Sequence, residues 1–279
     1  MEPAGIALRL LTYLQGGLLL GVLLFWSPWT GQMRFAAASL AAAGAVLTAA
    51  TMLVLAASFS EGGALLDAPT LWMLLTQTAM GWVAIARIAV FVVLIAIMSM
   101  GEQRHLASMI AFIAIGSFGW NGHGAMTNGG TGWLHLAGNA LHLIAGLSWI
   151  GAIAAFLWAA MRPKGVAQDL FADLERFAKT GTILVAVVLA TGISNTFFIV
   201  GWDGVLGLVD TIYGRVLLMK ISLFIVMLGA AATNRFWLSP RLVGSSSFAA
   251  LRVSLGAELL LGLGVLALVA LVGTLDPAS

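Results

Sequence analysis

The sequence contains no cysteine, and only 9% of its 279 residues are charged. The absence of cysteine excludes disulfide bonds, thiolate metal sites and cysteine nucleophiles, so a metal could be held only by histidine, methionine, carboxylates or the backbone. Ordinary soluble domains carry about 25% charged residues. With 61% hydrophobic residues, the chain is therefore predicted to lie in a membrane. A net charge of only +2 gives no reason to expect a nucleic-acid partner.

Apolar runs bounded by charges, prolines or glycine clusters predict eight helices that cross the lipid bilayer. Four are expected in a first half, residues 1–122, near 6–27, 35–58, 82–100 and 104–121. Four more are expected in a second half, residues 123–279, near 133–160, 176–200, 213–236 and 250–274. A shorter run at 70–80 follows Pro69 and predicts a helix that lies along the membrane surface.

Matching residues in the two halves predict an internal repeat. Lys220 in the seventh span corresponds to Arg87 in the third, and each follows a glycine by six residues. Gly151 in the fifth span corresponds to Gly21 in the first. Because four crossings return the chain to the same side, the halves share one orientation. The predicted fold class is all-α, a polytopic membrane protein with eight transmembrane helices in two four-helix parallel repeats.

Lysine and arginine are concentrated on one side of the predicted bundle, which indicates its orientation. The other side has only Arg9 and Arg215 near its span ends. The basic side is expected to face the cytoplasm, so both termini are expected in the periplasm of a bacterial inner membrane. The basic side carries Arg34, Arg104, Arg162, Lys164, Arg176, Lys179, Arg235, Arg241 and Arg252.

Three of the four histidines, His123, His135 and His142, fall at the outer end of spans four and five, whereas His105 begins span four at the cytoplasm. His135 and His142 are seven residues apart, which places them on one helix face about 10 Å apart. Met126 lies in the polar loop near His123. Imidazole and thioether together favour copper over magnesium or calcium. These three outer histidines and Met126 are the candidate metal ligands; hydrogen bonding between helices is the alternative role for a histidine here.

Three further charges are predicted within the membrane. Arg87 and Lys220 lie about two helical turns inside the outer boundary. Each could extend to the surface and pair with the acidic loop before it, or line a polar cavity suited to an anion or a haem propionate. Glu258 lies about as deep from the cytoplasmic side, where a lone carboxylate would be costly. Arg235 is the first choice for its partner, and another group on the cytoplasmic side near the start of span eight is the alternative.

Several segments resemble the copper resistance D (CopD) family of membrane proteins. The resemblance implies an eight-span inner-membrane protein of copper homeostasis that moves copper inward, often beside a periplasmic copper-binding CopC partner. It carries over His123, His142 and Trp149, whereas Asn139 stands where relatives often have an acidic residue. The segments are LHLIAGLSWIG at 141–151, GHGA at 122–125, TGISN at 191–195, YGRVLLMK at 213–220 and NRFWLSPRL at 234–242.

The leading functional hypothesis is copper import, with capture by the outer ligands and passage inward to His142. The oxidation state of the copper is left open. One alternative is a membrane b-type haem protein, with His142 as an axial ligand and Arg87 or Lys220 at the propionates; the repeat offers Thr12, not a second histidine, at the matching position. Another is a copper-binding assembly or receptor protein that does not translocate the metal. No enzymatic activity is expected, and no nucleotide-binding loop is present.

Overall fold

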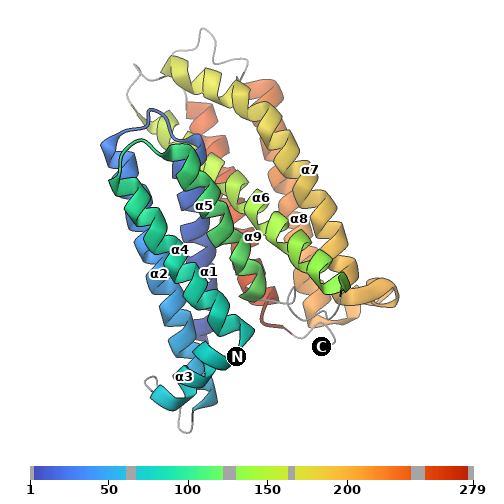
Figure 1. Cartoon of the computed structure of the whole chain (residues 1–279). Coiled ribbons are helices and arrows are strands. Elements are labelled where there is room, and N and C mark those ends of the chain that lie inside the picture. The colour runs from blue at the N-terminus through green and yellow to red at the C-terminus, as the bar shows by residue number, and fades with distance from the viewer. Residues whose placement is uncertain (1–2, 61–66, 122–129, 163–166, 240–248, 276–279) are drawn as a thin grey trace.

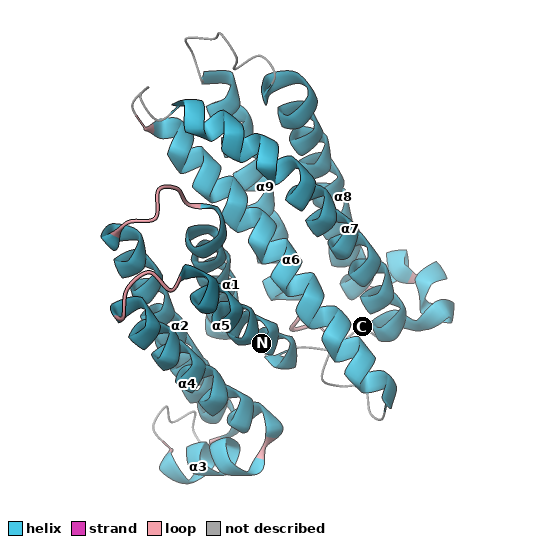
Figure 2. Cartoon of the chain, turned by 45° about the horizontal axis from the view of Figure 1, so that its top comes forward, coloured by secondary structure: helices cyan, strands magenta, loops and turns pink. Residues whose placement is uncertain are grey.

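The computed structural model describes residues 3–60, 67–121, 130–162, 167–239 and 249–275. Within these ranges every regular element is a helix and none is a strand (Figure 2). The prediction of an all-α fold is therefore confirmed for this part of the chain. The long helices form one bundle, and the start of α1 lies at the same end of the bundle as the end of α9 (Figure 1).

The first five helices correspond closely to the apolar runs of the sequence. They are α1 (Pro3–Leu20), which continues into the π-helical turn η1 (Gly21–Phe25), α2 (Gly31–Phe59), α3 (Ala68–Gln77), α4 (Ala79–Ser99) and α5 (Arg104–Gly116), which continues into the 3₁₀ turn η3 (Ser117–Asn121). The short helix expected at 70–80 is found as α3. Asp67 caps it, and a hydrogen bond from the Thr70 hydroxyl at 2.7 Å helps to hold the pKa of Asp67 below its usual range.

The remaining elements include the two longest described helices, α6 with 32 residues and α7 with 40. These elements are α6 (Gly130–Met161), α7 (Ala167–Leu206), the 3₁₀ turn η6 (Leu208–Asp210), α8 (Ile212–Thr233), the π-helical turn η7 (Asn234–Leu238) and α9 (Ala249–Val272). The expected start of α7 near residue 176 is wrong, because the charged residues before it continue the helix instead of ending it. Arg176 and Asp173 form an ion pair at 3.3 Å on this extension, one helical turn apart.

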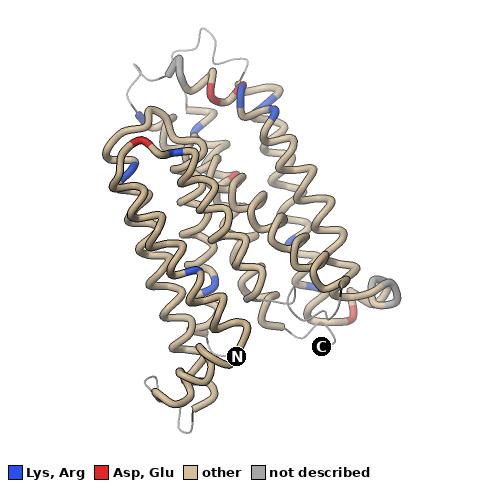
Figure 3. Tube along the Cα trace, in the orientation of Figure 1, with Lys and Arg blue, Asp and Glu red and all other residues tan. Residues whose placement is uncertain are grey.

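Seven helical segments of the described chain are long and apolar enough to cross a bilayer: Pro3–Phe25, Gly31–Phe59, Ala79–Ser99, Gly130–Met161, Leu170–Gly201, Ile212–Leu238 and Ala249–Val272. The eighth expected span, 104–121, is divided between α5 and η3. Charged residues lie mostly toward the two ends of the helices, and long stretches between them carry none (Figure 3). The chain is thus a polytopic helical membrane protein, while the eight-span repeat stays a prediction.

The helices α1 and α6 cross in direct backbone contact. A Cβ atom on Gly21 would lie 2.5 Å from the carbonyl oxygen of Gly151, and a Cβ on Gly151 would overlap the carbonyl oxygen of Gly17. Only glycine lets two helix backbones approach this closely. Such contacts are common in membranes, where the hydrophobic effect does not drive helices together and close packing at small residues does. The glycines that the sequence matches between the two halves therefore meet each other at the centre of the bundle.

Helix packing differs between the two sides of this crossing. On one side α2 packs along α4, and on the other α6 packs along α7 and α8 along α9. The pair α7 and α8 has no comparable packing in the described residues. The space between α7 and α8 holds the candidate functional site.

Candidate functional site

Two cavities lie between α6, α7, α8 and α9. The first, here called the His142 cavity, has a volume of about 320 Å³ and is also lined by α1. The second, the Glu258 cavity, has a volume of about 610 Å³ and lies further toward the end of the bundle opposite the termini. Trp149 lines both cavities, and its ring packs edge-on against Phe224 at 5.6 Å between centroids. Trp149 therefore separates the two cavities, and Phe224 packs against it from the side of the His142 cavity.

The hydrogen bonds of Thr191 fix the tautomer of a neutral His142. Nδ1 of His142 lies 3.0 Å from Oγ1 of Thr191, and the single hydroxyl proton of Thr191 is donated to the Val187 carbonyl at 2.5 Å. Thr191 therefore accepts from Nδ1–H, and the lone pair of a neutral imidazole is on Nε2. His142 thus offers one metal-competent nitrogen in the wall of the cavity.

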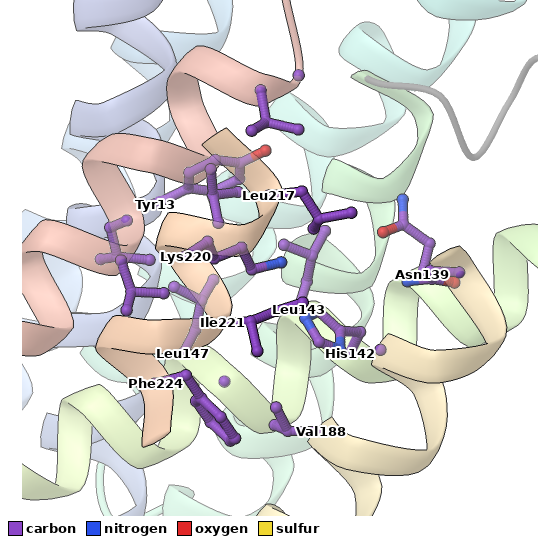
Figure 4. A pocket seen from close by; sticks show the side chains of 18 of the residues that line it. Tyr13, Asn139, His142, Leu143, Leu147, Val188, Leu217, Lys220, Ile221 and Phe224 are labelled. Carbon is purple, nitrogen blue, oxygen red and sulfur yellow. The ribbon is translucent and has the colours of Figure 1, made fainter. Parts of the chain in front are cut away.

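Other polar groups line the same cavity (Figure 4). Lys220 extends into it from α8, toward His142 on α6, and Asn139 lies one turn before His142. The side-chain oxygen of Asn195 is buried without a hydrogen-bond partner among the described residues. Apolar side chains such as Leu143 make up most of the remaining wall. The cavity therefore combines an apolar body with a few polar groups, as is typical of ligand sites.

The other candidate ligands do not share this cavity in the described structure. His135 is 1% exposed and stacks on Phe198 of α7, with ring centroids 4.8 Å apart. It is not among the residues that line the His142 cavity. His123 and Met126 lie outside the described residues. Within the described part of the chain, no three His, Cys, Asp or Glu side chains form a cluster that could hold a metal, so metal binding by these residues stays a prediction.

Arg87 and Lys220 have different surroundings despite their matching places in the sequence. Arg87 donates to Oγ of Ser117 at 2.7 Å and to its carbonyl oxygen at 2.6 Å, and lies over the Phe118 ring. Lys220 lines the His142 cavity. Arg87 is buried and Lys220 is half-buried, and neither forms an ion pair with an acidic residue of the described chain.

The expected pairing of Glu258 with Arg235 is wrong. Oε2 of Glu258 accepts a hydrogen bond from Nδ2 of Asn234 at 2.8 Å. Arg235 turns the other way and donates to the carbonyl of Ala178 and the hydroxyl of Thr182 on α7. The reason is the π-helical turn η7, which begins at Asn234. The wider turn directs Asn234, and not Arg235, toward Glu258 on α9.

Replacing Asn234 by leucine should lower the free energy of unfolding by about 1–3 kcal/mol, because it leaves the buried Glu258 carboxyl without a partner. Replacing both residues, Asn234→Leu with Glu258→Leu, should cost less than the single change, since no polar group is then left unsatisfied. Thermal unfolding of the purified variants in one detergent measures both. A double variant less stable than Asn234→Leu would contradict the pairing.

The fold defines a polytopic helical membrane protein with a polar cavity inside its bundle, and comparison with known proteins identifies its kind. The family model described as "Copper resistance protein D" matches residues 171–272, and "Copper resistance protein D-like, N-terminal domain" matches residues 1–133. The chain is 35% identical over 222 residues to Copper resistance protein D of Pseudomonas syringae pv. tomato, which covers 74% of this chain and 71% of that protein.

A second relative is Inner membrane protein YebZ of Escherichia coli (strain K12). It is 29% identical over 211 residues, which is 74% of this chain and 72% of that protein. No solved structure matches the chain significantly. The chain belongs to the copper resistance protein D family, and the family resemblance of its sequence is confirmed. Its apolar helices and this second relative indicate a multi-pass protein of the inner membrane.

Sequence reasoning did not assign a role to Thr191 or Asn195, although both belong to the segment TGISN that resembles the family. Thr191 orients His142, and Gly192 leaves room for its ring, since a Cβ there would lie 3.3 Å from Cε1. The sequence does contain a sign of this role, because threonine, serine and asparagine lie close together here inside an apolar span. Such side chains often form hydrogen bonds to a neighbouring helix.

Proposed function

We propose that this protein imports copper from the periplasm to the cytoplasm, with His142 as the ligand inside the membrane. The observation that carries the proposal is the bond from His142 to Thr191, which leaves Nε2 as the acceptor nitrogen in the cavity wall. Metal-binding histidines usually donate their second ring N–H to such a partner. The name of the relative from Pseudomonas syringae pv. tomato supports copper as the metal.

The two cavities provide the proposed route. Copper enters the His142 cavity, passes the Trp149–Phe224 pair and reaches the Glu258 cavity. The buried carboxyl group of Glu258 is the second polar group that copper contacts on this route. A single imidazole with few additional donors suits transfer, because a closed four-ligand site would hold the metal too tightly to release it. In this proposal His123, Met126 and His135 bind copper at the periplasmic side before it enters the His142 cavity. A CopC-like periplasmic protein delivers the copper to them.

Eight crossings in two similar halves form part of the proposal. The helix α5 has 13 residues and η3 has 5, which together span about 30 Å, the thickness of the hydrocarbon core. An even number of crossings also agrees with the start of α1 and the end of α9 at one end of the bundle (Figure 1). The basic starts of α2, α5 and α9 then face the cytoplasm, and both termini face the periplasm.

Equivalent contacts within each half support the repeat. Arg104, near the start of α5, donates to the Leu23 carbonyl at 2.6 Å, close to the end of the α1–η1 segment. Arg252, near the start of α9, donates to the Ala160 carbonyl at 2.6 Å, close to the end of α6. In both halves an arginine of the last helix thus reaches a free carbonyl at the end of the first.

Copper flux into liposomes that contain only this protein tests the proposal. Isotopically labelled copper should enter faster than into protein-free liposomes of the same lipid. The absorption spectrum of the same purified sample separates the haem alternative, which requires a Soret band. Copper binding without any flux would contradict import and favour a receptor or assembly role.

Replacing Thr191 by valine should weaken copper binding by about 10–100-fold, the usual cost of losing the partner that orients a metal-binding histidine. Valine has the shape of threonine but cannot accept from Nδ1–H. Thr233→Val is the matched control, because Thr233 lies on α8 outside the lining of the His142 cavity and its hydroxyl bonds to the Gly229 carbonyl of its own helix. Competition with a chromogenic copper chelator measures both; equal affinities would contradict the orienting role.

A further inference from the structure

The His142 cavity contains a cation where a metal cation is proposed to bind. The charged residues that line it are Lys220 and Arg9, and no carboxylate is among its described lining residues. Arg9 has interactions of its own. Within the described chain, the Lys220 ammonium has neither an ion pair nor a hydrogen bond. Its charge inside a membrane protein is costly unless something compensates it.

The matching residue Arg87 shows how the chain compensates a buried cation when no ligand is involved. Its guanidinium group is bonded to Ser117 and covered by the Phe118 ring. Around Lys220 the corresponding space is a cavity, and Figure 4 shows the amine extending toward His142. Because no described protein group takes this place beside Lys220, the contrast points to a ligand as its partner.

Two further polar atoms complete this arrangement. Nε2 of His142 offers a lone pair suited to copper, and the Asn195 side-chain oxygen is buried without a hydrogen-bond partner among the described residues. A bare copper ion would be repelled by Lys220, since like charges repel strongly away from water. A metal-coordinating anion would be attracted by Lys220 and could occupy the coordination position opposite His142.

We infer that the His142 cavity binds copper together with a small metal-coordinating anion, with copper on His142 and the anion between the metal and Lys220. This inference rests on the proposed function and names the form in which its cargo binds. Binding is a ligand exchange: the imidazole and the anion replace water on copper, and no electron is transferred. For copper(I) and a monovalent anion the bound unit is neutral, which lowers the cost of taking the metal out of water.

Copper(I) binding by the purified full chain, with chloride as the anion, tests the inference. Free copper(I) is fixed with a chelator, and chloride is exchanged for methanesulfonate at constant ionic strength. Chloride should raise the affinity of the wild type at least about tenfold. X-ray absorption at the copper edge should show chloride bound to the metal.

Lys220→Met should weaken copper(I) binding in chloride by at least about tenfold and abolish the chloride effect. Lys220→Arg should retain the effect. Arg215→Met is the matched control, because Arg215 is an exposed cation of the same helix that bonds to the Val209 carbonyl outside the cavity; this variant should behave as the wild type.

If Lys220 only repels copper, its replacement by methionine should strengthen copper binding instead of weakening it. Tighter copper binding by Lys220→Met would therefore overturn the inference. Copper binding by the wild type that does not depend on chloride would also overturn it and would leave the proposed function standing. A wild-type protein that binds no copper at all would overturn the proposed function and the inference together. Circular dichroism of each variant confirms that its helices are intact.

Discussion

Copper transport is expected to be lost when His142 is replaced by alanine. Alanine removes the only imidazole among the described residues that line the His142 cavity, and copper affinity should fall by at least about tenfold, equal to about 1.4 kcal/mol. Flux into liposomes should fall further than binding, because the proposed route passes from the outer ligands to His142 before it reaches the Trp149–Phe224 pair. The measurements are chelator competition for affinity and isotopic copper uptake for flux.

His105→Ala is the control for this experiment. His105 is exposed at the start of α5, at the end of the bundle opposite the termini. Its removal should leave binding and flux near the wild type. Substitution of His123 or His135 should chiefly reduce capture at low copper concentrations. Equal flux for His142→Ala and His105→Ala would refute a histidine path through the cavity.

The second large effect is expected on folding. A Cβ at Gly151 would overlap the Gly17 carbonyl and lie 2.7 Å from the backbone nitrogen of Gly21. Backbone atoms cannot rotate away as side chains can, so Gly151→Ala must separate α1 from α6. The expected loss is about 1–3 kcal/mol or more of unfolding free energy, with a lower yield of folded protein in the membrane.

Gly146→Ala gives the matched control on the same helix, because a Cβ at Gly146 meets no atom within 4 Å. This change should leave stability unchanged or slightly raise it, since alanine favours helix over glycine. Thermal unfolding in detergent and size-exclusion profiles of both variants make the comparison. If the two alanine variants melt at the same temperature, the α1–α6 crossing does not hold the bundle together.

Most of the helical architecture is predictable because membrane spans are recognised by length and hydrophobicity alone. The bounds of α2, α4 and α9 lie within a few residues of their apolar runs. The start of α7 is missed because its first turns are amphipathic, so their charged residues resemble a loop. The division of 104–121 into α5 and η3 could not be foreseen either, since a change of helix type leaves little trace in composition.

The site is predictable only in part. A histidine inside a span is conspicuous, so His142 is found from the sequence, but its partner Thr191 lies 49 residues away and only the fold brings the two together. The pairing of Glu258 with Asn234 depends on the π-helical turn at the end of α8, which an ideal helical wheel does not contain. The cavity lies where the described residues of α7 and α8 pack less closely against each other than those of α8 and α9, and no local sequence pattern predicts such loose packing.

The different environments of Arg87 and Lys220 have a consequence for stoichiometry. At the position that corresponds to His142, the first half has Thr12, whose hydroxyl bonds to the Leu8 carbonyl of its own helix. Arg87 is satisfied by Ser117, whereas Lys220 faces a cavity. The proposed intramembrane copper site therefore has no counterpart in the described part of the predicted first half, and a titration of that site should reach its end point at one equivalent of copper per chain.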